Sequence, residues 1–430
     1  MLTRRSLLGI AAATTGAGLA SRGLAQLLNG AVDASQLGVT QGNDIGAALN
    51  RAIAQVAKDG GGVLRLDGGL YGTRDPIILQ TGVTLKGTGE TTLYASAPIG
   101  DAKAKRSLIE QPDGTARCGL ADILLDCRNQ VEFAAWRAVA PRETTCTGVV
   151  MRGWTFGVYF VSTADSSADG VTFRDTIIHQ GADRQIYPAF LSSTTGGKPF
   201  RNLLIERMTL AGTGGSYSPT NAATADQLTM QNVRGFVLRD VISRDGGENG
   251  MSIVRGCRDG EMSNIIVTGA DGQGCQIGGG GLEVTVSDPA PFAKGLRVQG
   301  LESGAEAIVD LVAGNQVWLS RLMRRQFSPA EEIVCGGQRV RMSDPQFCRN
   351  IALDGLKASR NGRNAAAIKG AFADLYITHA EDITVRNARI GGAQGHGLLV
   401  NNSRNVPCAL SGALGNDGPS RRGGPVVCAA

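Results

Sequence analysis

The pattern of apolar positions predicts one helix followed by many short strands. Apolar residues recur at helical spacing directly after the polar pair Asn43-Asp44, which is typical of an N-cap, so we predict a capping helix over residues 44–58. The glycines of Gly60–Gly62 end this helix. Beyond them, apolar and polar residues alternate over short runs such as Val83–Lys86, which indicates strands joined by tight turns.

The strands belong to a repeating unit. Leu228, Met251 and Cys275 begin comparable apolar strands, and the interval between them is nearly constant. A period of this size is typical of solenoids, and units that cannot bury an apolar face alone favour a parallel β-helix. We therefore predict an all-β protein, a single-stranded right-handed parallel β-helix that fills residues 26–430 as one domain. The helix at 44–58 is expected to cover the open end, and residues 184–218 and 311–347 to form loops over one face.

Composition agrees with this fold and excludes several function classes. The chain holds 61 Gly and only 14 Pro among its 430 residues, with 42% hydrophobic and 19% charged residues. That balance supplies a core and argues against disorder. The formal charge of +5 falls to +2 without Arg4, Arg5 and Arg22, which lie in a first segment that has no acid. Because no Lys/Arg block remains, we expect no nucleic-acid partner.

The amino-terminal segment 1–25 is typical of an export signal. A basic start at Arg4-Arg5, a short apolar stretch and small residues before Ala25 fit this class, and the stretch is too short and too rich in Gly and Thr to span a membrane. The segment resembles the twin-arginine export signal, with a chance arginine pair on a general secretory signal as the alternative. The resemblance implies a periplasmic or secreted protein that is cleaved near Ala25 and has no stable membrane span.

The nine cysteines fit an oxidising compartment. None lies in a Cys-x-x-Cys motif, so zinc and redox sites are not predicted. The disulfide connectivity stays open. The pairs that are near in sequence are Cys118/Cys127, Cys335/Cys348 and Cys408/Cys428.

Residues 38–95 resemble the start of the pectate-lyase-like superfamily. The resemblance rests on the helix, the Gly-rich turn, the Gly69-Leu70-Tyr71 strand end and the turn Leu85–Gly89. The export signal and the repeat also resemble twin-arginine-translocated β-helix repeat proteins. This resemblance implies a right-handed parallel β-helix for the whole mature chain and specifies its chemistry only weakly.

Polar residues on successive turns distantly resemble the polygalacturonase-type glycoside hydrolases. That family carries Asn-Thr-Asp, Gly-Asp-Asp, Gly-His-Gly and Arg-Ile-Lys segments on consecutive turns. Here Asp226, the segment Asp245–Glu248, Gln273 and Arg297 follow in the same order. This chain has no adjacent Asp pair, and Gln273 and Gln299 replace the family's His and Lys, so an ordinary polygalacturonase activity is not implied.

The stacking of parallel strands gives these carboxylates a physical rationale. Strands about 4.8 Å apart place carboxyls of neighbouring turns roughly 5–10 Å from each other, which brackets both glycosidase geometries. The solvated turn is the plain alternative, because Asp, Asn and Gly favour turns. The candidate catalytic residues are Asp226, Asp245 and Glu248. The candidate substrate-binding residues are Gln273, Arg297 and Arg255, and the guanidinium groups of the two arginines suit a sugar carboxylate.

A second candidate site lies on the first insertion. His179, Arg184 and Tyr187 are the residue types that β-elimination or epimerisation of a uronate needs, namely a base and a group that neutralises charge. His396 is predicted to be a turn residue. We predict no cofactor and no metal, although turn carboxylates bind calcium in some solenoids.

The sequence therefore predicts an exported protein that cleaves glycosidic bonds of an acidic polysaccharide with paired carboxylates. Two alternatives stay open. One is a uronate lyase or epimerase, and the other is a non-catalytic glycan-binding or envelope scaffold protein. The sugar, the linkage and the oligomeric state are left open.

Overall fold

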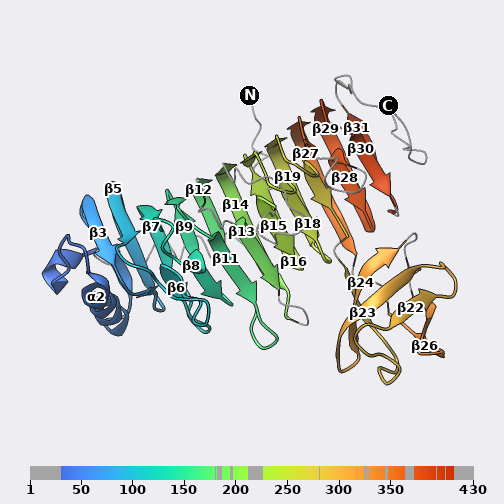
Figure 1. Ribbon diagram of the computed structural model, residues 1–430, viewed down its shortest axis with the longest axis horizontal. Helices are drawn as coiled ribbons and strands as arrows, with labels where there is room; N and C mark the ends of the chain where they lie inside the picture. The colour runs from blue at the N-terminus through green and yellow to red at the C-terminus, as the bar shows by residue number, and fades with distance from the viewer. Residues whose placement is uncertain are drawn as a thin grey trace, which may run out of the picture.

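The computed structural model describes most of the chain. The described residues are 31–179, 181, 186–193, 197–211, 226–279, 281–323 (321–323 as backbone), 327–328, 330–343, 347–363, 372–393, 395–401 and 403–410. Within them the chain winds into a long stack of short strands that runs from one end of the molecule to the other (Figure 1). The predicted export signal and Arg184 lie outside the described residues.

Two sheets form the stack. In the described part of the chain, all strand pairs of these two sheets are parallel, and fifteen strands form one sheet while ten form the other. The fifteen-stranded sheet contains β1 (Val32–Asp33), β2 (Gly62–Arg65), β3 (Gly69–Thr73), β5 (Val83–Ala95), β7 (Gly119–Asp126), β9 (Thr145–Thr147), β10 (Val150–Arg152), β12 (Thr172–His179), β14 (Phe200–Ala211), β16 (Val233–Arg239), β17 (Ile242–Arg244), β19 (Arg258–Thr268), β27 (Cys348–Ser359), β29 (Ala380–Gly391) and β31 (Cys408–Leu410). The ten-stranded sheet contains β4 (Ile77–Ile78), β6 (Ile109–Gln111), β8 (Ala134–Val139), β11 (Phe156–Ser162), β13 (Tyr187–Ser193), β15 (Leu228–Gln231), β18 (Met251–Val254), β20 (Cys275–Ile277), β28 (Ala373–Thr378) and β30 (His396–Asn401).

The register confirms the repeat read from the sequence. Leu228 pairs with Met251, and Met251 pairs with Cys275, so one interval of the sequence repeat is one turn of the coil. These side chains are fully buried inside the coil, in one continuous apolar core. The predicted parallel β-helix is confirmed.

Asn and Asp residues form the corners of the coil. Asp240 and Asn264 have positive φ angles on neighbouring turns, and the Asn264 amide donates to the Asp240 carboxylate at 3.0 Å. Asn350 and Asp259 repeat the arrangement at 2.8 Å. Asn and Asp tolerate the left-handed conformation and hydrogen-bond locally, which is why the sequence places them at these bends.

A helix lies at the N-terminal end of the stack. After a 3-10 turn, η1 (Ala34–Leu37), helix α2 (Gly46–Lys58) buries Leu49, Ile53 and Val56 and contacts β2 and β4 (Figure 1). Its N-cap is Ile45, without a side-chain hydrogen bond, so the predicted Asn43-Asp44 cap is wrong. The Asn43 side chain instead accepts a hydrogen bond from Tyr94. The role of α2 as a cap stays a prediction.

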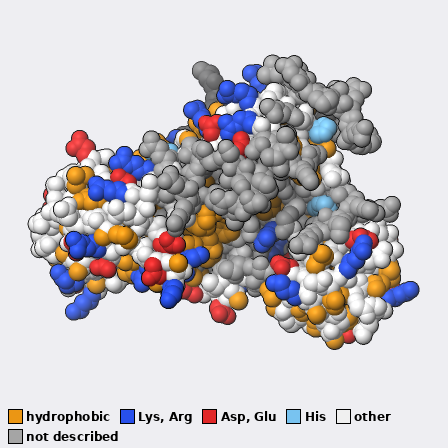
Figure 2. All heavy atoms as spheres, viewed as in Figure 1, with side chains coloured by type: hydrophobic (Ala, Val, Ile, Leu, Met, Phe, Trp, Pro, Cys, Tyr) orange, Lys and Arg blue, Asp and Glu red, His pale blue; other side chains and the backbone are white. Residues whose placement is uncertain are grey.

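An antiparallel sheet branches from the stack between β20 and β27. Among the described residues, its six strands are β21 (Leu282–Thr285), β22 (Arg297–Gly300), β23 (Glu306–Ala313), β24 (Gln316–Met323), β25 (Glu332–Cys335) and β26 (Gln338–Arg341). We call residues 282–341 the antiparallel unit. It has its own apolar core, and Figure 2 shows Lys and Arg side chains on its visible face. The predictions that 184–218 and 311–347 form loops are therefore wrong. In the described part of 184–218, β13 and β14 continue the two sheets of the coil, and in 311–347 alternating apolar residues pair as strands of the antiparallel unit.

The described cysteines form no disulfide bonds between the pairs that lie near each other in the sequence. The eight described cysteines are free thiols. Cys257 lies level with Cys348 on the next turn, because Arg258 pairs with Arg349. Stacking in space therefore brings together cysteines that lie far apart along the chain, which spacing in the sequence does not reveal.

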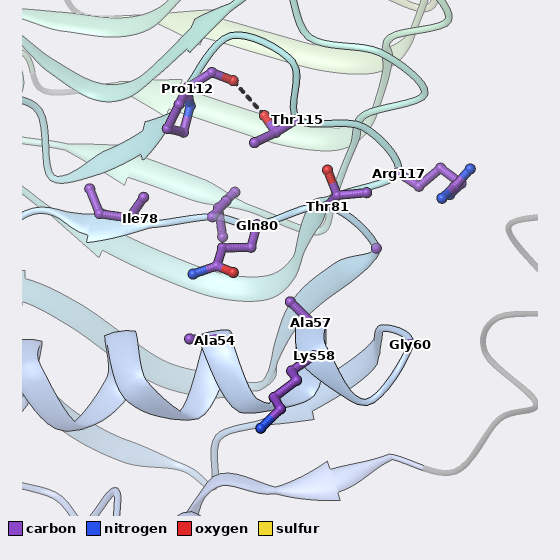
Figure 3. A pocket seen from close by; sticks show the side chains of 12 residues that line it. Ala54, Ala57, Lys58, Gly60, Ile78, Gln80, Thr81, Pro112, Thr115 and Arg117 are labelled. Atoms are coloured by element: carbon purple, nitrogen blue, oxygen red, sulfur yellow. Dashed lines mark hydrogen bonds between the residues drawn. The ribbon is translucent and has the colours of Figure 1, made fainter.

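Two further features complete the description of the fold. An open hollow of about 640 Å³ separates α2 from the turns after β4 and β6, with Lys58 and Arg117 on its rim and pointing away from it (Figure 3). It lies many turns from Asp226. Within the described ranges, the structure contains no helix with the length and apolar character that a membrane span requires.

Candidate functional site

Two of the carboxylates that were predicted to be catalytic lie close together at one edge of the ten-stranded sheet. Asp226 lies two residues before β15, and Glu248 lies in the turn that leads into β18. Because Leu228 pairs with Met251, Asp226 is level with Asn249, the neighbour of Glu248. The two carboxyl groups interact electrostatically. We call Asp226 and Glu248 the acid pair.

Hydrogen bonds fix Asp226 in place. The Thr229 hydroxyl donates to one carboxylate oxygen at 2.9 Å. The backbone N–H and the side-chain amide of Asn249 donate to the other, at 3.2 and 2.8 Å. Asp226 is only 8% exposed, so these donors replace the water that its carboxylate would otherwise bind.

Burial changes the protonation of both carboxyls. It raises the pKa of Asp226, while the donors from Ser252, Thr229 and Asn249 act in the opposite direction. Burial, followed by the nearby charge of Asp226, raises the pKa of Glu248 from its ordinary value to about 7. Burial therefore favours the protonated form of both groups, and the charge of Asp226 when ionised further favours a proton on Glu248.

Tyr187 belongs to the same cluster. Ala189 pairs with Leu228, so Tyr187 is level with Asp226 on the preceding turn. Burial, then the charges of Asp226 and Glu248, raises the pKa of the Tyr187 hydroxyl, and Arg255 acts in the opposite direction. The structure thus joins one residue of the alternative site, Tyr187, to the acid pair and to the predicted binding residue Arg255.

Aromatic side chains continue the site along the outer face of the sheet. The rings of Tyr159 and Phe190 stack at 5.2 Å, those of Phe156 and Tyr187 stack at 5.7 Å, and Phe133 contacts Phe156 and Tyr159. We call these five residues the aromatic row. They pack on one another across the turns next to Asp226, and four of them are partly exposed.

A polar column links the acid pair to the following turns. Asp226, Asn249 and Gln273 occupy the same position on three successive turns. The Gln273 N–H donates to the Asn249 side-chain oxygen at 2.8 Å, and the Gln273 side chain accepts from the Ala373 N–H at 2.7 Å. Gln273, predicted to bind substrate, is thus a member of the ladder that holds Asn249 and, through it, Asp226.

Asp245 faces a different partner. Its side chain is 57% exposed and forms an ion pair with Arg363 at 3.2 Å. The same guanidinium binds Asp271 at 3.1 Å. The segment Asp245–Asn249 therefore has an exposed, ion-paired carboxylate at one end and the partly buried Glu248 near the other.

The remaining predicted residues lie elsewhere. Arg297 is on β22 of the antiparallel unit and forms a short ion pair with Glu306, so its segment does not form the next turn of the coil, as the resemblance had implied. The insertion of 282–341 breaks the repeat there. His179 ends β12 in the other sheet, where burial and Arg152 lower its pKa. His396 begins β30 and pairs with Ala373, so it is a strand residue and not the predicted turn residue.

Sequence reasoning missed three components of the site. The repeat spacing could have identified Asn249, which lies one repeat after Asp226 and one repeat before Gln273. The aromatic row and Asp374 gave no local signal, because register alone brings them into place. Asp374 is fully buried, accepts from Asn361 at 2.6 Å, and burial raises its pKa to about 6.

The described residues contain no group of three His, Cys, Asp or Glu side chains arranged to hold a metal ion. The chemistry that the described side chains offer is proton transfer and charge stabilisation by the acid pair, Tyr187 and Arg255.

Comparison with solved structures places the fold among parallel β-helix proteins. The chain is similar to the A-module of a mannuronan C-5 epimerase from Azotobacter vinelandii, with a TM-score of 0.53, 13% identity and 88% of each chain covered. It is also similar to the Dettilon tailspike protein, with a TM-score of 0.54, 10% identity, and 89% of this chain and 63% of the tailspike covered. No protein-family model and no curated protein sequence matches the chain. At these identities the likeness concerns the fold alone.

Proposed function

We propose that this chain is a polysaccharide-active enzyme that cleaves glycosidic bonds of an acidic polysaccharide with Asp226 and Glu248. One observation carries the proposal, namely two carboxyl groups that interact in a largely buried setting on neighbouring turns. Glycoside hydrolysis needs two carboxyls whose environments keep one protonated and the other ionised.

The proposed roles follow from the contacts of each group. Glu248, with a pKa raised to about 7, protonates the glycosidic oxygen as the bond breaks. Asp226 acts as the carboxylate, because the donors from Thr229 and Asn249 favour its ionised form. It either attacks the anomeric carbon or activates a water molecule. Arg255, whose charge interacts with the Tyr187 hydroxyl, neutralises the substrate's carboxylate.

The aromatic row supports a sugar chain as the substrate. Partly exposed rings next to the acid pair offer flat apolar surfaces, onto which the apolar faces of sugar rings pack. A structural neighbour named as a mannuronan epimerase is in accord with this substrate class. Export to the periplasm or the medium belongs to the same proposal and rests on residues 1–25.

One observation favours a second candidate, a uronate lyase or epimerase. Tyr187 interacts with both carboxyls and with Arg255. A tyrosine beside a carboxylate and a guanidinium supplies the acid, base and charge neutralisation that removal of a proton next to a uronate carboxyl requires.

A product assay separates the candidates. We expect polyuronates incubated with the protein to yield new reducing ends without the ultraviolet absorbance of unsaturated uronates. Tyr187→Phe should retain at least about a tenth of this activity, because the hydroxyl only adjoins the reacting pair. Appearance of the absorbance, lost in Tyr187→Phe, would establish the lyase. Isomerised uronates without cleavage would establish the epimerase, and binding without any reaction the scaffold protein.

A further inference from the structure

Four arginines form a column on the fifteen-stranded sheet. Arg201 pairs with Arg234, Arg234 with Arg258, and Arg258 with Arg349, so each lies directly beside the next on successive described turns. We call these residues the arginine ladder. Since neighbouring parallel strands are about 4.8 Å apart, four positive charges stand in a row at that spacing.

This arrangement differs from a second column of charges, five residues further along β14 and β16. There, Arg174 of β12 pairs with Glu206 of β14 and Glu206 with Arg239 of β16, and ion pairs of 3.1 and 3.2 Å join them. Alternating charges stabilise a parallel sheet, whereas like charges directly opposite each other destabilise it. The arginine ladder is thus a column in which the sequence keeps repulsion that it avoids five residues further along the same two strands, β14 and β16.

The described carboxylates neutralise the ladder only in part, and one of them, Asp169, pairs with Arg201 at its first end. Glu283 of β21 interacts with Arg234 and Arg258, and Asp259 interacts with Arg258. Glu381 pairs with Arg349 in the sheet but forms its ion pair with Arg404, at 3.0 Å.

Burial makes the repulsion costly. Burial, followed by the charge of Arg258, lowers the pKa of Arg234 to about 10, and the Nε of Arg234 is buried without a hydrogen-bond partner among the described residues. Buried donors of this kind are normally satisfied, and a guanidinium binds carboxylate or sulfate groups through two parallel hydrogen bonds.

The position of the ladder relates it to the acid pair. Arg234 and Arg258 come shortly after the ends of β15 and β18, whereas Asp226 and Glu248 precede the same two strands. The ladder and the acid pair therefore border opposite edges of this part of the ten-stranded sheet. The antiparallel unit stands beside the ladder and contributes Glu283.

We propose that the arginine ladder is a binding site for a linear anionic polysaccharide that runs along the stack, with one carboxylate or sulfate group at each guanidinium. The repeating turns of the protein place one guanidinium on each turn. A polymer with an anionic group on each sugar presents a matching row of negative charges. The site is separate from the acid pair and does not depend on the proposed hydrolysis.

Binding of defined polymers tests this site. Calorimetry with the full chain would use polygalacturonate and its fully methyl-esterified counterpart, and dextran sulfate and plain dextran, so that each anionic probe has an uncharged match. The protein used would carry Glu248→Gln, so that the polymer is not cleaved during the titration. Binding to this variant can be measured whether or not the acid pair is catalytic. We expect binding of polygalacturonate, dextran sulfate or both, weakening steeply with salt. Binding of neither, or tighter binding of duplex DNA than of both, would overturn the proposal.

Variants locate the binding. The double variant with Arg234→Gln and Arg258→Gln should bind the anionic polymers at least about tenfold more weakly, because each substitution removes a charge-assisted contact. The matched control Arg239→Gln, on the same strand but paired with Glu206, should change it less than about twofold. Unchanged binding in the double variant would overturn the proposal.

Two further measurements exclude a merely structural role. If the ladder carries unrelieved repulsion, the double variant should keep or raise the melting temperature. Glu283→Gln removes an opposing charge and should tighten binding severalfold. A double variant that melts earlier, together with unchanged binding in Glu283→Gln, would show that the arginines only pack against the antiparallel unit.

Discussion

The two ends of the segment Asp245–Asn249 show how environment divides chemically identical groups. Asp245 is exposed and ion-paired with Arg363, which also binds Asp271. Glu248, on the same turn, is partly buried and interacts with a second carboxylate, Asp226. The exposed end resembles an ordinary surface ion pair, worth at most about 1 kcal/mol. The buried end holds a proton near neutral pH, which is the property that catalysis needs.

The largest expected difference between the two ends is in activity. Glu248→Gln should lower kcat by about 10³-fold, since it removes the proposed proton donor while keeping its shape. Asp245→Asn, the matched control on the same turn, should stay within about threefold of the unchanged protein. Release of reducing ends from a polyuronate measures both. Equal losses in the two variants would place Asp245 in the reacting group and contradict the division.

The pH dependence of activity should follow Glu248. The proposed acid works only when protonated, so the rate should fall about tenfold per pH unit above the pKa of Glu248, about 7. Rate profiles of unchanged protein and Asp245→Asn should coincide in shape. A rate that stays level up to pH 9 would exclude Glu248 as the acid.

Stability should show the same titration without any substrate. The pKa of Glu248 rises from 4.5 in the unfolded chain to about 7 in the folded one, so its protonation stabilises the fold below pH 4.5. This contribution is lost as the pH rises through 7. Between pH 4.5 and pH 8 the unchanged protein should lose on the order of 2 kcal/mol more unfolding free energy than Glu248→Gln. Urea unfolding measures the difference, and identical losses would show that Glu248 is not perturbed.

A smaller effect is expected at the aromatic row beside the buried end. Phe190→Ala should raise KM about tenfold and leave kcat nearly unchanged, because the ring binds substrate and transition state alike. Ile177→Ala, at an exposed apolar residue on β12, is the control and should change neither constant. A loss confined to kcat would assign Phe190 to positioning of the acid pair.

The smallest expected effect is at the exposed end. Arg363→Gln breaks the ion pairs with Asp245 and Asp271 and should lower the unfolding free energy by no more than about 1 kcal/mol. Its activity should remain within about threefold. Thermal unfolding and the reducing-end assay together check this, and a large loss of activity with normal stability would show that the two ends act as one site.

Much of the fold could be predicted from the sequence because its signals are local. The recurrence of Leu228, Met251 and Cys275 gave the repeat, and the register confirms it. The resemblance correctly implied that Asp226 and Glu248 lie on neighbouring turns. It failed at Arg297, because an inserted antiparallel unit follows β20 and the chain resumes the coil only at β27. The apolar alternation around Arg297 is the same in an inserted strand as in the coil, so this segment was interpreted as a further turn, while 311–347 was predicted to be a loop.

The sequence by itself determined the period of the coil, the apolar interior and the Asn and Asp corners, since each depends on residues near one another in the chain. Tertiary structure alone decided which polar groups share an environment. It left Glu248 partly buried and Asp245 exposed, set Tyr187 level with Asp226, and stacked Arg201, Arg234, Arg258 and Arg349. Burial and charge proximity depend on which turns become neighbours and on what covers them. Those are properties of the assembled stack, and the spacing of residues along the chain does not contain them.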